Sequence, residues 1–397
     1  MNKVVISDKG LPYLKNGQKW MFVNNLASDI TDIENGSVVK IFDRNDNFVA
    51  SGFISKETHI LVRIASFNEK EVIDDDFLKD MMKQAVNKRK AMMSDNFTNC
   101  RLIYGEADNL GGITVDRYND ILVFQISSYP MEIRKEMLAD SLFEILRQLG
   151  ETINGIYWRN DVKAREKEKL SLYKKWYWHN EKTDGTTVIN ENGILLNVDV
   201  INGQKTGYFL DQKENRLLVR SLARDKKVLD CYCHTGAFSL NAAKGGCKKV
   251  DGIDLSATAV KLAYENRDLN GFGDNCNFIV DDVDHYLDNC KKGQYDLIIL
   301  DPPAFCKSKR TFEHAYNGYK NINVKAFNLL DSGDILISCS CSRFMPDADF
   351  ERMLQEAAKE ANKEYEILNV GTQSNDHPID TVMGETKYLK FYCLKIK

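Results

Sequence analysis

The alternation of short apolar runs with helix-like segments in the C-terminal half constrains the fold of this chain most strongly. From about Asn192 onward, apolar runs of strand length recur at Val228–Cys233, Val250–Leu255, Asn277–Asp281, Tyr295–Leu300 and Ile335–Cys339. Helices are expected between them at Ala237–Lys244, Ser256–Asn270 and Tyr316–Leu330, with Ser256 as an N-cap. This alternation predicts a parallel sheet covered by helices on both faces, which binds ligands at the carboxyl ends of its strands.

The N-terminal half shows a different pattern, with short strand candidates and two longer helices. The strand candidates are Ser37–Phe42, Phe48–Ile54, Ile60–Ile64, Ile113–Val115, Ile121–Ser127 and Ile156–Arg159. Helical spacing of apolar residues appears in Phe77–Met93 and Glu132–Leu149. We therefore predict three domains, at residues 1–72, 73–190 and 191–397.

Composition places the chain among ordinary globular proteins. Hydrophobic residues make up 43% of the 397 residues and charged residues 28%, which argues against disorder. The formal net charge of −4 lacks the basic excess of a typical nucleic-acid binder, although it leaves room for a local basic face. We find no apolar stretch of signal-peptide or membrane-span length, so we expect no membrane association, a cytoplasmic location and free thiols for the ten cysteines.

The turn after the first predicted strand of the C-terminal domain distinguishes two cofactor classes. A nicotinamide dinucleotide requires a Gly-x-Gly-x-x-Gly turn, so that a pyrophosphate can approach the helix N-terminus. The segment Leu229–Phe238 has a single glycine, Gly236, placed where the backbone is expected to come close to a ligand. S-adenosylmethionine carries no phosphate and does not need the other two glycines. The turn therefore favours S-adenosylmethionine.

Acidic residues stand at the ends of four predicted strands. These residues are Asp230, Asp254, Asp282 and Asp301, and the last of them opens an Asp-Pro-Pro motif. Asp254 follows Asp230 by the separation of roughly 20 residues that is expected of a ribose-binding carboxylate. Asp282 is placed to meet an adenine amino group. Any one acid could be an ordinary strand-end cap, but four in register favour a cofactor site.

Five segments of the chain resemble one protein family. The segments are Trp20–Phe22, Gly105–Arg117, Lys205–Arg216, Asp301–Phe305 and Ser340–Ser342. They resemble the class I ribosomal RNA cytosine-C5 methyltransferases with an N-terminal PUA domain, which modify large-subunit RNA. The resemblance covers essentially the whole chain, although Gln18-Lys19 stands where the family usually has His-Pro.

The resemblance implies a fold and a set of partners. It implies a β-rich PUA-like RNA-binding domain, a small central α+β domain and a C-terminal Rossmann-like class I methyltransferase domain. S-adenosylmethionine is the implied cofactor and 23S ribosomal RNA the implied substrate; a homodimer is left open. No metal is expected, because His234 and His377 show no metal-ligand spacing with a nearby Cys or His pair.

A single set of residues is expected to contact the cofactor. By similarity, Lys205–Arg216 closes over it, and Arg216 suits either a ligand carboxylate or a buried structural ion pair. The expected cofactor-binding residues are Tyr208, Asp211, Gln212, Arg216, Asp230, Tyr232, Thr235, Gly236, Ala237, Phe238, Asp254, Leu255, Ser256, Asp282, Val283, Asp301 and Pro302.

The cysteines are candidates for covalent catalysis. Cytosine C5 is a poor nucleophile, but a thiolate that adds to C6 places electron density on C5. The resemblance selects Cys341 over Cys339 as this nucleophile and assigns Asp301 a contact with the cytosine edge. Many RNA cytosine-C5 methyltransferases have a second cysteine directly after the proline, where this chain has Ala304, so Cys306 is interpreted as structural.

Three other functions compete with this interpretation. A guanine N-methyltransferase on the same scaffold needs no nucleophilic cysteine. A non-catalytic RNA-binding assembly factor needs no strand-end acids, and a dehydrogenase needs the missing glycines. The segment Tyr173–Trp178 mixes aromatic and basic residues, which fits either stacking on RNA bases or a strand with one buried face, and we favour the strand.

Overall fold

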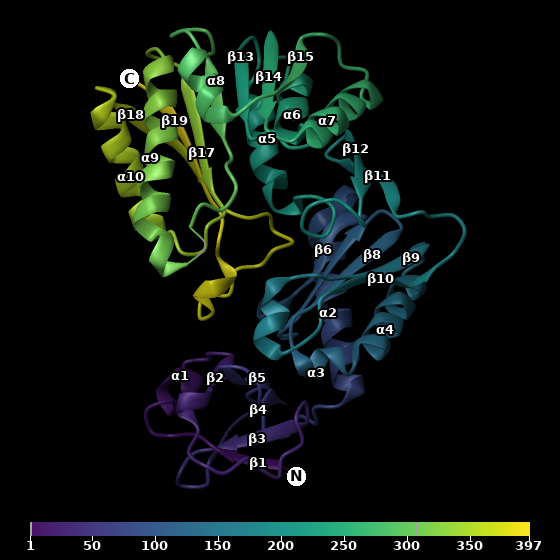
Figure 1. Cartoon of the computed structure of the whole chain (residues 1–397). Coiled ribbons are helices and arrows are strands. Elements are labelled where there is room, and N and C mark those ends of the chain that lie inside the picture. Colours follow the sequence, from purple (N-terminus) through teal and green to yellow (C-terminus); the bar gives the residue numbers. More distant parts are fainter. Residues whose placement is uncertain (1, 307) are drawn as a thin grey trace. The chain divides into compact units, whose positions relative to one another are not determined.

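The computed structural model describes residues 2–306 and 308–397, which divide into two compact units (Figure 1). The first unit comprises Met1–Ile189, Val198–Leu210 and Asn375–Thr386. The second comprises Asn190–Asn197, Asp211–Ser374 and Lys387–Lys397. The first unit thus includes two segments, Val198–Leu210 and Asn375–Thr386, that follow residues of the second unit in the sequence, so each unit is built from several separate stretches of the chain.

The first unit begins with a small β-rich part. Its five-stranded sheet has the order β1-β3-β4-β5-β2, in which β1 and β3 are parallel and the other pairs antiparallel. Its elements are β1 (Asn2–Val5), α1 (Leu11–Lys15), β2 (Trp20–Phe22), η1 (Val23–Asn25), β3 (Val38–Phe42), β4 (Phe48–Ile54) and β5 (Ile60–Ser66). The predicted strands in this region are confirmed, because alternating residues such as Val39 and Ile41 are buried in one apolar cluster.

An α+β part follows in the same unit. Its sheet has the order β10-β9-β8-β7-β6, with β8 and β9 parallel. Its elements are α2 (Asp75–Met93), η2 (Ser94–Asn96), β6 (Asn99–Tyr104), η3 (Gly105–Asp108), β7 (Ile113–Tyr118), β8 (Ile121–Ile126), α3 (Tyr129–Glu132), α4 (Lys135–Gln148), β9 (Gly155–Asn160), η4 (Lys163–Glu168) and β10 (Tyr173–His179). A two-stranded sheet, β11 (Thr186–Glu191) with β12 (Ile194–Asp199), then links the two units along the chain.

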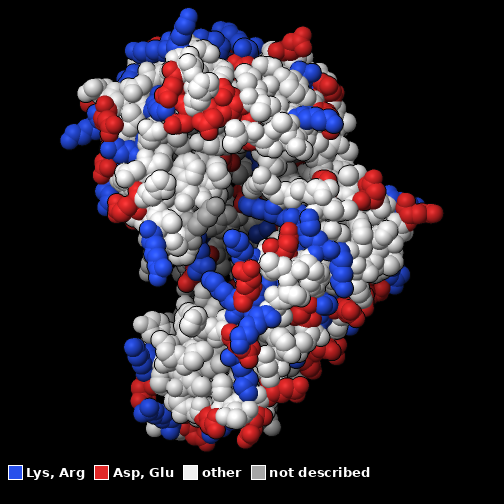
Figure 2. All heavy atoms as spheres, in the orientation of Figure 1, with Lys and Arg blue, Asp and Glu red and all other residues white. Residues whose placement is uncertain are grey.

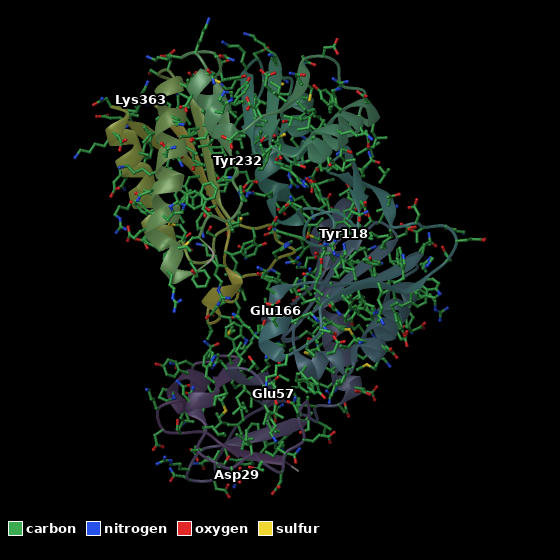
Figure 3. The ribbon with its side chains drawn as sticks, viewed as in Figure 1. Asp29, Glu57, Tyr118, Glu166, Tyr232 and Lys363 are labelled. Carbon is green, nitrogen blue, oxygen red and sulfur yellow. The ribbon has the colours of Figure 1, made fainter. Side chains whose placement is uncertain are left out.

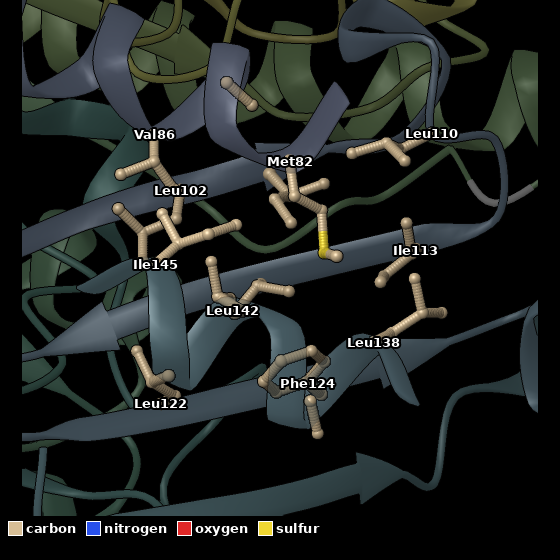
Figure 4. Packing of buried hydrophobic residues seen from close by; sticks show 14 of the residues in the cluster. Met82, Val86, Leu102, Leu110, Ile113, Leu122, Phe124, Leu138, Leu142 and Ile145 are labelled. Atoms are coloured by element: carbon tan, nitrogen blue, oxygen red, sulfur yellow. The ribbon is translucent and has the colours of Figure 1, made fainter. Parts of the chain in front are cut away.

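Helices α2 and α4 bury their apolar faces against this sheet (Figure 4). Met82 and Val86 come from α2, and Leu138 and Leu142 come from α4. The prediction of one helix over Glu132–Leu149 is wrong at its start, because the chain turns at Ile133–Arg134 between α3 and α4. The Arg134 guanidinium donates to the Pro130 and Gly36 carbonyls, which holds this turn.

The second unit contains a seven-stranded sheet with helices on its faces. The strand order is β15-β14-β13-β16-β17-β19-β18; the first five are parallel, and β19 is antiparallel to both its neighbours. Its elements are η5 (Leu210–Gln212), α5 (Lys213–Leu222), β13 (Lys227–Cys231), α6 (Ala237–Lys244), β14 (Lys249–Asp254), α7 (Ala257–Leu269), β15 (Cys276–Val280), α8 (Val283–Asn289), β16 (Leu297–Leu300), η6 (Lys309–Thr311), α9 (Phe312–Leu329), β17 (Ile335–Ser340), α10 (Asp347–Glu360), β18 (Tyr365–Gly371) and β19 (Lys390–Ile396). The short helix η7 (Gly384–Thr386) lies between β18 and β19 in the sequence but belongs to the first unit.

Two sets of helices cover the sheet of the second unit. Helices α8, α9 and α10 share one hydrophobic cluster with it, whereas α6 and α7 pack against β13, β14 and β15. The strand order reverses between β13 and β16, which is the switch point where open α/β sheets bind ligands. The prediction of a Rossmann-like C-terminal domain is confirmed.

The core of Figure 4 gives a test of the first unit. Leu142→Ala should lower the free energy of unfolding of this unit by about 2–5 kcal/mol, because Leu142 is fully buried and its removal leaves a cavity. Urea unfolding followed by fluorescence of the buried Trp158 measures the change. Leu172→Ala is the matched control, since Leu172 is 44% exposed and its truncation should change stability by less than about 0.5 kcal/mol. Equal effects of the two variants would contradict the assignment of the core.

Candidate functional site

Three of the four predicted acids, Asp230, Asp254 and Asp301, belong to or follow β13 and its two neighbouring strands at the switch point of the second unit, whereas Asp282 follows the edge strand β15. Cys231 at the end of β13 pairs with Ile253 of β14 on one side and with Leu300 of β16 on the other. Asp254 and Asp301 follow these two partners directly, so their backbones lie at the same edge of the sheet. The parallel register therefore brings together acids that are about 50 residues apart in the sequence.

Asp230 is the most deeply buried of these acids. Its Oδ2 accepts hydrogen bonds from the Ser239 backbone N–H at 2.9 Å and from the Ser239 hydroxyl at 2.6 Å. Its Oδ1 is buried and has no hydrogen-bond partner among the described residues. Burial raises the pKa of Asp230 to about 7, with a smaller contribution from the nearby Asp301 carboxylate. A buried acceptor of this kind fits a ligand that brings its own hydrogen-bond donor.

Asp254 connects two adjacent loops. Its Oδ2 accepts from the His234 backbone N–H at 2.9 Å, and its Oδ1 accepts from the Ser256 N–H at 2.8 Å. Ser256 itself caps α7, as predicted, by accepting from the Ala259 N–H. The next residue in the chain, Leu255, is 71% exposed. Asp254 is thus held in place by backbone donors and is only half-buried.

The loop after β13 contains an unusual run of left-handed backbone conformations. Tyr232 (φ +62°), His234 (φ +50°) and Gly236 (φ +84°) all lie in this region, which costs energy for the two residues that carry a Cβ. A Cβ at Gly236 would stand 2.7 Å from the Phe278 ring. The positive φ and the close packing on Phe278 therefore explain why position 236 is a glycine, whether or not a ligand approaches its backbone.

Other residues of this loop are largely fixed by packing. Thr235, Ala237 and Phe238 are buried, and the Thr235 carbonyl accepts from the Asn266 side chain. Tyr232 (labelled in Figure 3) is partly buried, and its ring makes an edge contact with the Phe305 ring. The loop is consequently a rigid wall beside the strand-end acids.

Asp282 acts as the N-cap of α8. Its Oδ1 accepts a hydrogen bond from the His285 N–H at 3.1 Å, so this acid does serve as an ordinary cap, which is the alternative role that the sequence left open. The carboxylate is exposed, while the next residue, Val283, is buried. An exposed carboxylate can accept a hydrogen bond from the amino group of a purine, and an apolar neighbour can pack against the purine ring.

The segment Asp211–Arg216 is anchored within the second unit. Gln212 donates from Nε2 to Asp301 Oδ1 at 3.1 Å and accepts from Asn215 at 2.6 Å. Asp211 accepts from the Tyr388 hydroxyl at 2.6 Å. Gln212 therefore fixes the carboxylate that begins the Asp-Pro-Pro motif, in which Pro302 is buried.

Arg216 and Tyr208 have structural partners. The Arg216 Nη1 contacts both oxygens of Glu191 at 2.8 and 2.9 Å, and both side chains are buried, which is the structural ion pair that the sequence left open. Tyr208 is buried in the first unit, where its carbonyl accepts from the Tyr118 hydroxyl (Figure 3). Their predicted contacts with a cofactor stay predictions.

The Ser340-Cys341-Ser342 motif is held by a tyrosine. The Tyr319 hydroxyl lies 3.0 Å from the Ser340 hydroxyl and 2.8 Å from the Ser342 hydroxyl, and all three side chains are buried. Cys341 follows β17 directly and is half-buried. The two serines therefore fix the backbone on both sides of the candidate nucleophile.

The three cysteines near this motif differ in their surroundings. Cys339 is fully buried, and burial raises the pKa of its thiol well above the ordinary value, which disfavours the thiolate. Cys306 is also buried, and its sulfur lies near the carbonyl oxygens of Ser308 and Phe344 at 3.5 and 3.6 Å. Of these three, Cys341 alone is partly exposed.

Sequence reasoning missed Lys390 as a member of this site. Lys390 begins β19, pairs with Ser340 across the sheet and is 4% exposed. Its Nζ donates to the Ser342 carbonyl at 2.6 Å and to the Tyr388 carbonyl at 2.9 Å. The sequence signal is weak, because a lysine before an apolar strand is usually a solvated end residue.

The first unit contains a separate pocket of about 660 Å³ in its β-rich part. Its lining includes Tyr13, Trp20 and Phe22, with Lys9 and His59 among the polar residues. The rings of Trp20 and Phe22 meet edge to face, and the Trp20 indole N–H donates to Glu106 at 2.8 Å. This fixed aromatic wall with an adjacent cation suits a flat, negatively charged ligand.

A basic surface lies on the α+β part of the same unit. Residues 163–175 contain six basic and two acidic residues, and five of the six are exposed lysines. Figure 2 shows Lys and Arg side chains gathered around the position that Figure 3 labels Glu166. The net charge of −4 therefore conceals a local basic face. The segment Tyr173–Trp178 forms a strand, β10, as predicted, but none of its residues is fully buried, so the expected buried face is absent; Trp176 packs on Tyr157.

Two further observations concern the described residues as a whole. Residues 2–306 and 308–397 hold no group of three or more His, Cys, Asp or Glu side chains arranged to bind a metal ion. Among the helices of this part of the chain, none combines the length and hydropathy of a membrane-spanning segment. None of the ten cysteines, all of which lie in the described part of the chain, forms a disulfide.

Comparison with protein families and known proteins identifies the architecture. Residues 167–388 match the S-adenosylmethionine-dependent methyltransferase family, and residues 4–67 match the PUA-like domain family. The chain is similar to a protein from Streptococcus mutans described as a SAM-dependent methyltransferase, with a TM-score of 0.82, 21% identity and complete coverage of both chains. At this identity the likeness shows a common fold.

Two curated relatives share much more of the sequence. The ribosomal RNA large subunit methyltransferase I of Aeromonas salmonicida is 37% identical over 94% of this chain and 93% of its own length. The protein of the same name from Aliivibrio fischeri strain MJ11 is 35% identical over 96% of each chain. This chain therefore belongs to the family of PUA-containing, S-adenosylmethionine-dependent class I methyltransferases that includes the ribosomal RNA large subunit methyltransferases I.

Proposed function

We propose that this chain methylates cytosine C5 in large-subunit ribosomal RNA, with Cys341 as the nucleophile. The observation that carries the proposal is the half-buried Cys341 at the end of β17, fixed by its two serine neighbours. The names of the relatives support ribosomal RNA as the substrate class. A ribosomal RNA substrate also favours a cytoplasmic location.

The residues at the switch point fit S-adenosylmethionine. Its methionine ammonium and two ribose hydroxyls are hydrogen-bond donors, which match the buried Oδ1 of Asp230 and the carboxylate of Asp254. Asp282 and Val283 would hold the adenine. When bound, this cofactor supplies a methyl group on a positively charged sulfur.

The chemistry assigned to Cys341 is a covalent addition followed by elimination. The Cys341 thiolate donates an electron pair to C6 of cytosine, forming an S–C6 bond and moving the C5=C6 electrons onto C5. C5 then forms its bond to the methyl group as the bond between that methyl and the cofactor sulfur breaks, and the electron pair of the broken bond stays on the sulfur. Loss of the C5 proton to a base returns an electron pair to the ring, the S–C6 bond breaks, and the thiolate is regenerated.

Asp301 is assigned the contact with the cytosine edge. The Gln212 amide holds the Asp301 carboxylate in place and leaves it partly exposed. A carboxyl group here can exchange hydrogen bonds with the N3 and amino edge of the base and stabilise the ring that forms after thiolate addition. This edge becomes accessible only when the base is withdrawn from stacking.

The first unit is assigned RNA recognition. The aromatic pocket beside Lys9 and the lysine-rich residues 163–175 give stacking and phosphate contacts, respectively. A guanine N-methyltransferase and a non-catalytic assembly factor remain the rivals. The half-buried Cys341 disfavours the first rival, and the acids at the switch point disfavour the second.

The cofactor assignment predicts a loss of affinity in Asp254→Ala. Dissociation constants for S-adenosylmethionine, measured by calorimetry, should rise at least tenfold, because hydrogen bonds to a charged group are worth about 1.5–3 kcal/mol each. Asp274→Ala is the matched control, since Asp274 is an exposed acid of the same unit. Unchanged affinity in a folded Asp254→Ala protein would remove this residue from the site, and NADH should bind to neither.

The nucleophile assignment predicts a covalent trap. RNA that carries 5-fluorocytosine at the target cannot release a C5 proton after methylation, so the protein–RNA adduct should persist on denaturing gels. The adduct should form only with S-adenosylmethionine present. Cys341→Ala should abolish the adduct and turnover, whereas Cys339→Ala should retain both.

The same experiment separates the rivals. Methyl transfer to RNA without an adduct in any variant would move the target to a guanine or an adenine. Cys306→Ser should keep turnover, because Cys306 is buried among backbone carbonyls. Accumulation of adduct on ordinary cytosine RNA in this variant would instead assign Cys306 to product release.

The RNA-binding assignment predicts a weaker complex for Tyr13→Ala. Tyr13 is 60% exposed at the pocket, and loss of one stacking surface should raise the dissociation constant for target RNA by about 5- to 150-fold, equivalent to ~1–3 kcal/mol. Phe67→Ala is the matched control, since Phe67 is an exposed aromatic residue of the same unit outside the pocket lining. Filter-binding titrations at fixed salt compare the variants, and equal affinities would exclude the pocket from RNA recognition.

A further inference from the structure

Lys390 is a buried lysine whose hydrogen-bond partners are backbone carbonyls. It lies at the start of β19 and is 4% exposed. Its Nζ donates to the carbonyls of Ser342 and Tyr388. Among the described residues, no carboxylate lies within salt-bridge distance of Nζ. A buried ammonium with neutral partners costs free energy, so a nearby anion would be strongly stabilised by it.

The ionisable groups whose charges act on the pKa of Lys390 come from several elements. They are Asp347 at the start of α10, Lys387 before β19, Cys306 after β16 and Cys341 after β17. Asp347 forms an ion pair with Lys387 at 2.7 Å, and both side chains are more than 40% exposed, so Lys387 and solvent screen the charge of Asp347. Cys306 is buried with its sulfur against backbone carbonyls. Cys341 is the remaining group that can become an anion and is also open to a reactant.

Backbone connections hold the ammonium close to Cys341. Lys390 pairs with Ser340, the residue before Cys341, and donates to the carbonyl of Ser342, the residue after it. Tyr319 fixes the hydroxyls of the same two serines. The lysine and the thiol are therefore attached to one rigid segment, on which their charges can interact.

We propose that the Lys390 ammonium is a positioning residue that stabilises the Cys341 thiolate, both before it attacks a base and when it departs. Ionisation breaks the Cys341 S–H bond, leaves its electron pair on sulfur and passes the proton to solvent. The ammonium keeps its own protons and contributes a fixed positive charge beside the sulfur. The inference rests on the proposed function only in naming Cys341 as the nucleophile.

The protonation state of Lys390 is compatible with this role. Burial lowers the pKa of Lys390 to about 8, opposed by the negative charges of Asp347 and Cys341. Below that pH the ammonium is the major form, and formation of the Cys341 thiolate favours it further. At neutral pH the site therefore holds a cation where the thiolate forms.

The test measures alkylation of Cys341 by iodoacetamide in the full-length protein, without RNA or cofactor. The rate at residue 341 is followed from pH 6 to 10 by peptide mass mapping. In Lys390→Met the midpoint of the pH profile should rise by about one unit or more, and the rate at pH 7 should fall roughly tenfold. Lys390→Arg should restore most of the rate, because it keeps a positive charge.

A matched control separates this effect from loss of a structural lysine. Lys363 also donates from Nζ to a backbone carbonyl, that of Leu330, and belongs to the same unit (Figure 3). Lys363→Met should leave the profile of Cys341 unchanged. A folded Lys390→Met protein with the wild-type profile would overturn the proposal.

A second measurement covers the case in which Lys390→Met does not fold. Coupling between two charges is reciprocal, so removing the thiol in Cys341→Ser should lower the pKa of Lys390. NMR titration of the lysine Cε–Nζ group reports this pKa, and an unchanged value would also overturn the proposal. A shifted alkylation profile without a 5-fluorocytosine adduct would instead sustain the lysine–thiolate pair and contradict cytosine-C5 methylation.

Discussion

The parallel pairing of β13 with β14 and β16 is the constraint on which the rest of the second unit depends. Backbone hydrogen bonds fix the register, so Cys231 faces Ile253 on one side and Leu300 on the other. Asp254, the last residue of β14, and Asp301, the first residue after β16, then lie at the same edge of the sheet. A shift of one residue in either pair would send these side chains to the opposite face. The acids share a site because the strands share a register.

The polar contacts around this edge make it rigid. Ser239 holds Asp230, Gln212 holds Asp301, and Tyr319 holds the two serines beside Cys341. The loop after β13 also contains residues with left-handed backbone, which persist only where the surroundings over-determine them. A site built this way positions its groups before a ligand arrives, which reduces the cost of ordering them during binding.

Sequence patterns predicted the strands, the helices and the acids of this sheet, but they did not predict which distant side chains contact these residues. The apolar runs located β13 to β17, and the acids after them were recognised from position alone. Arg216 was left between two roles, because its partner Glu191 lies on the hairpin strand β11, 25 residues earlier. Lys390 was missed, since a lysine before an apolar run looks like a solvated strand end. Partners from distant segments leave no periodic signal in the sequence.

The amino-acid sequence by itself determined which segments are strands and helices, because apolar periodicity and turn residues act over a few neighbouring positions. It also indicated where the chemistry-bearing residues lie, since the acids stand at strand ends in the order of the chain and the family resemblance pointed to the Ser-Cys-Ser motif. Tertiary structure alone decided that Cys339 is fully buried and that Cys341 is half-buried. It also decided that Lys390 is buried next to the Ser340–Ser342 segment that carries Cys341. Burial and electrostatic environment depend on packing between segments far apart in the chain, and these two quantities control which thiol can ionise.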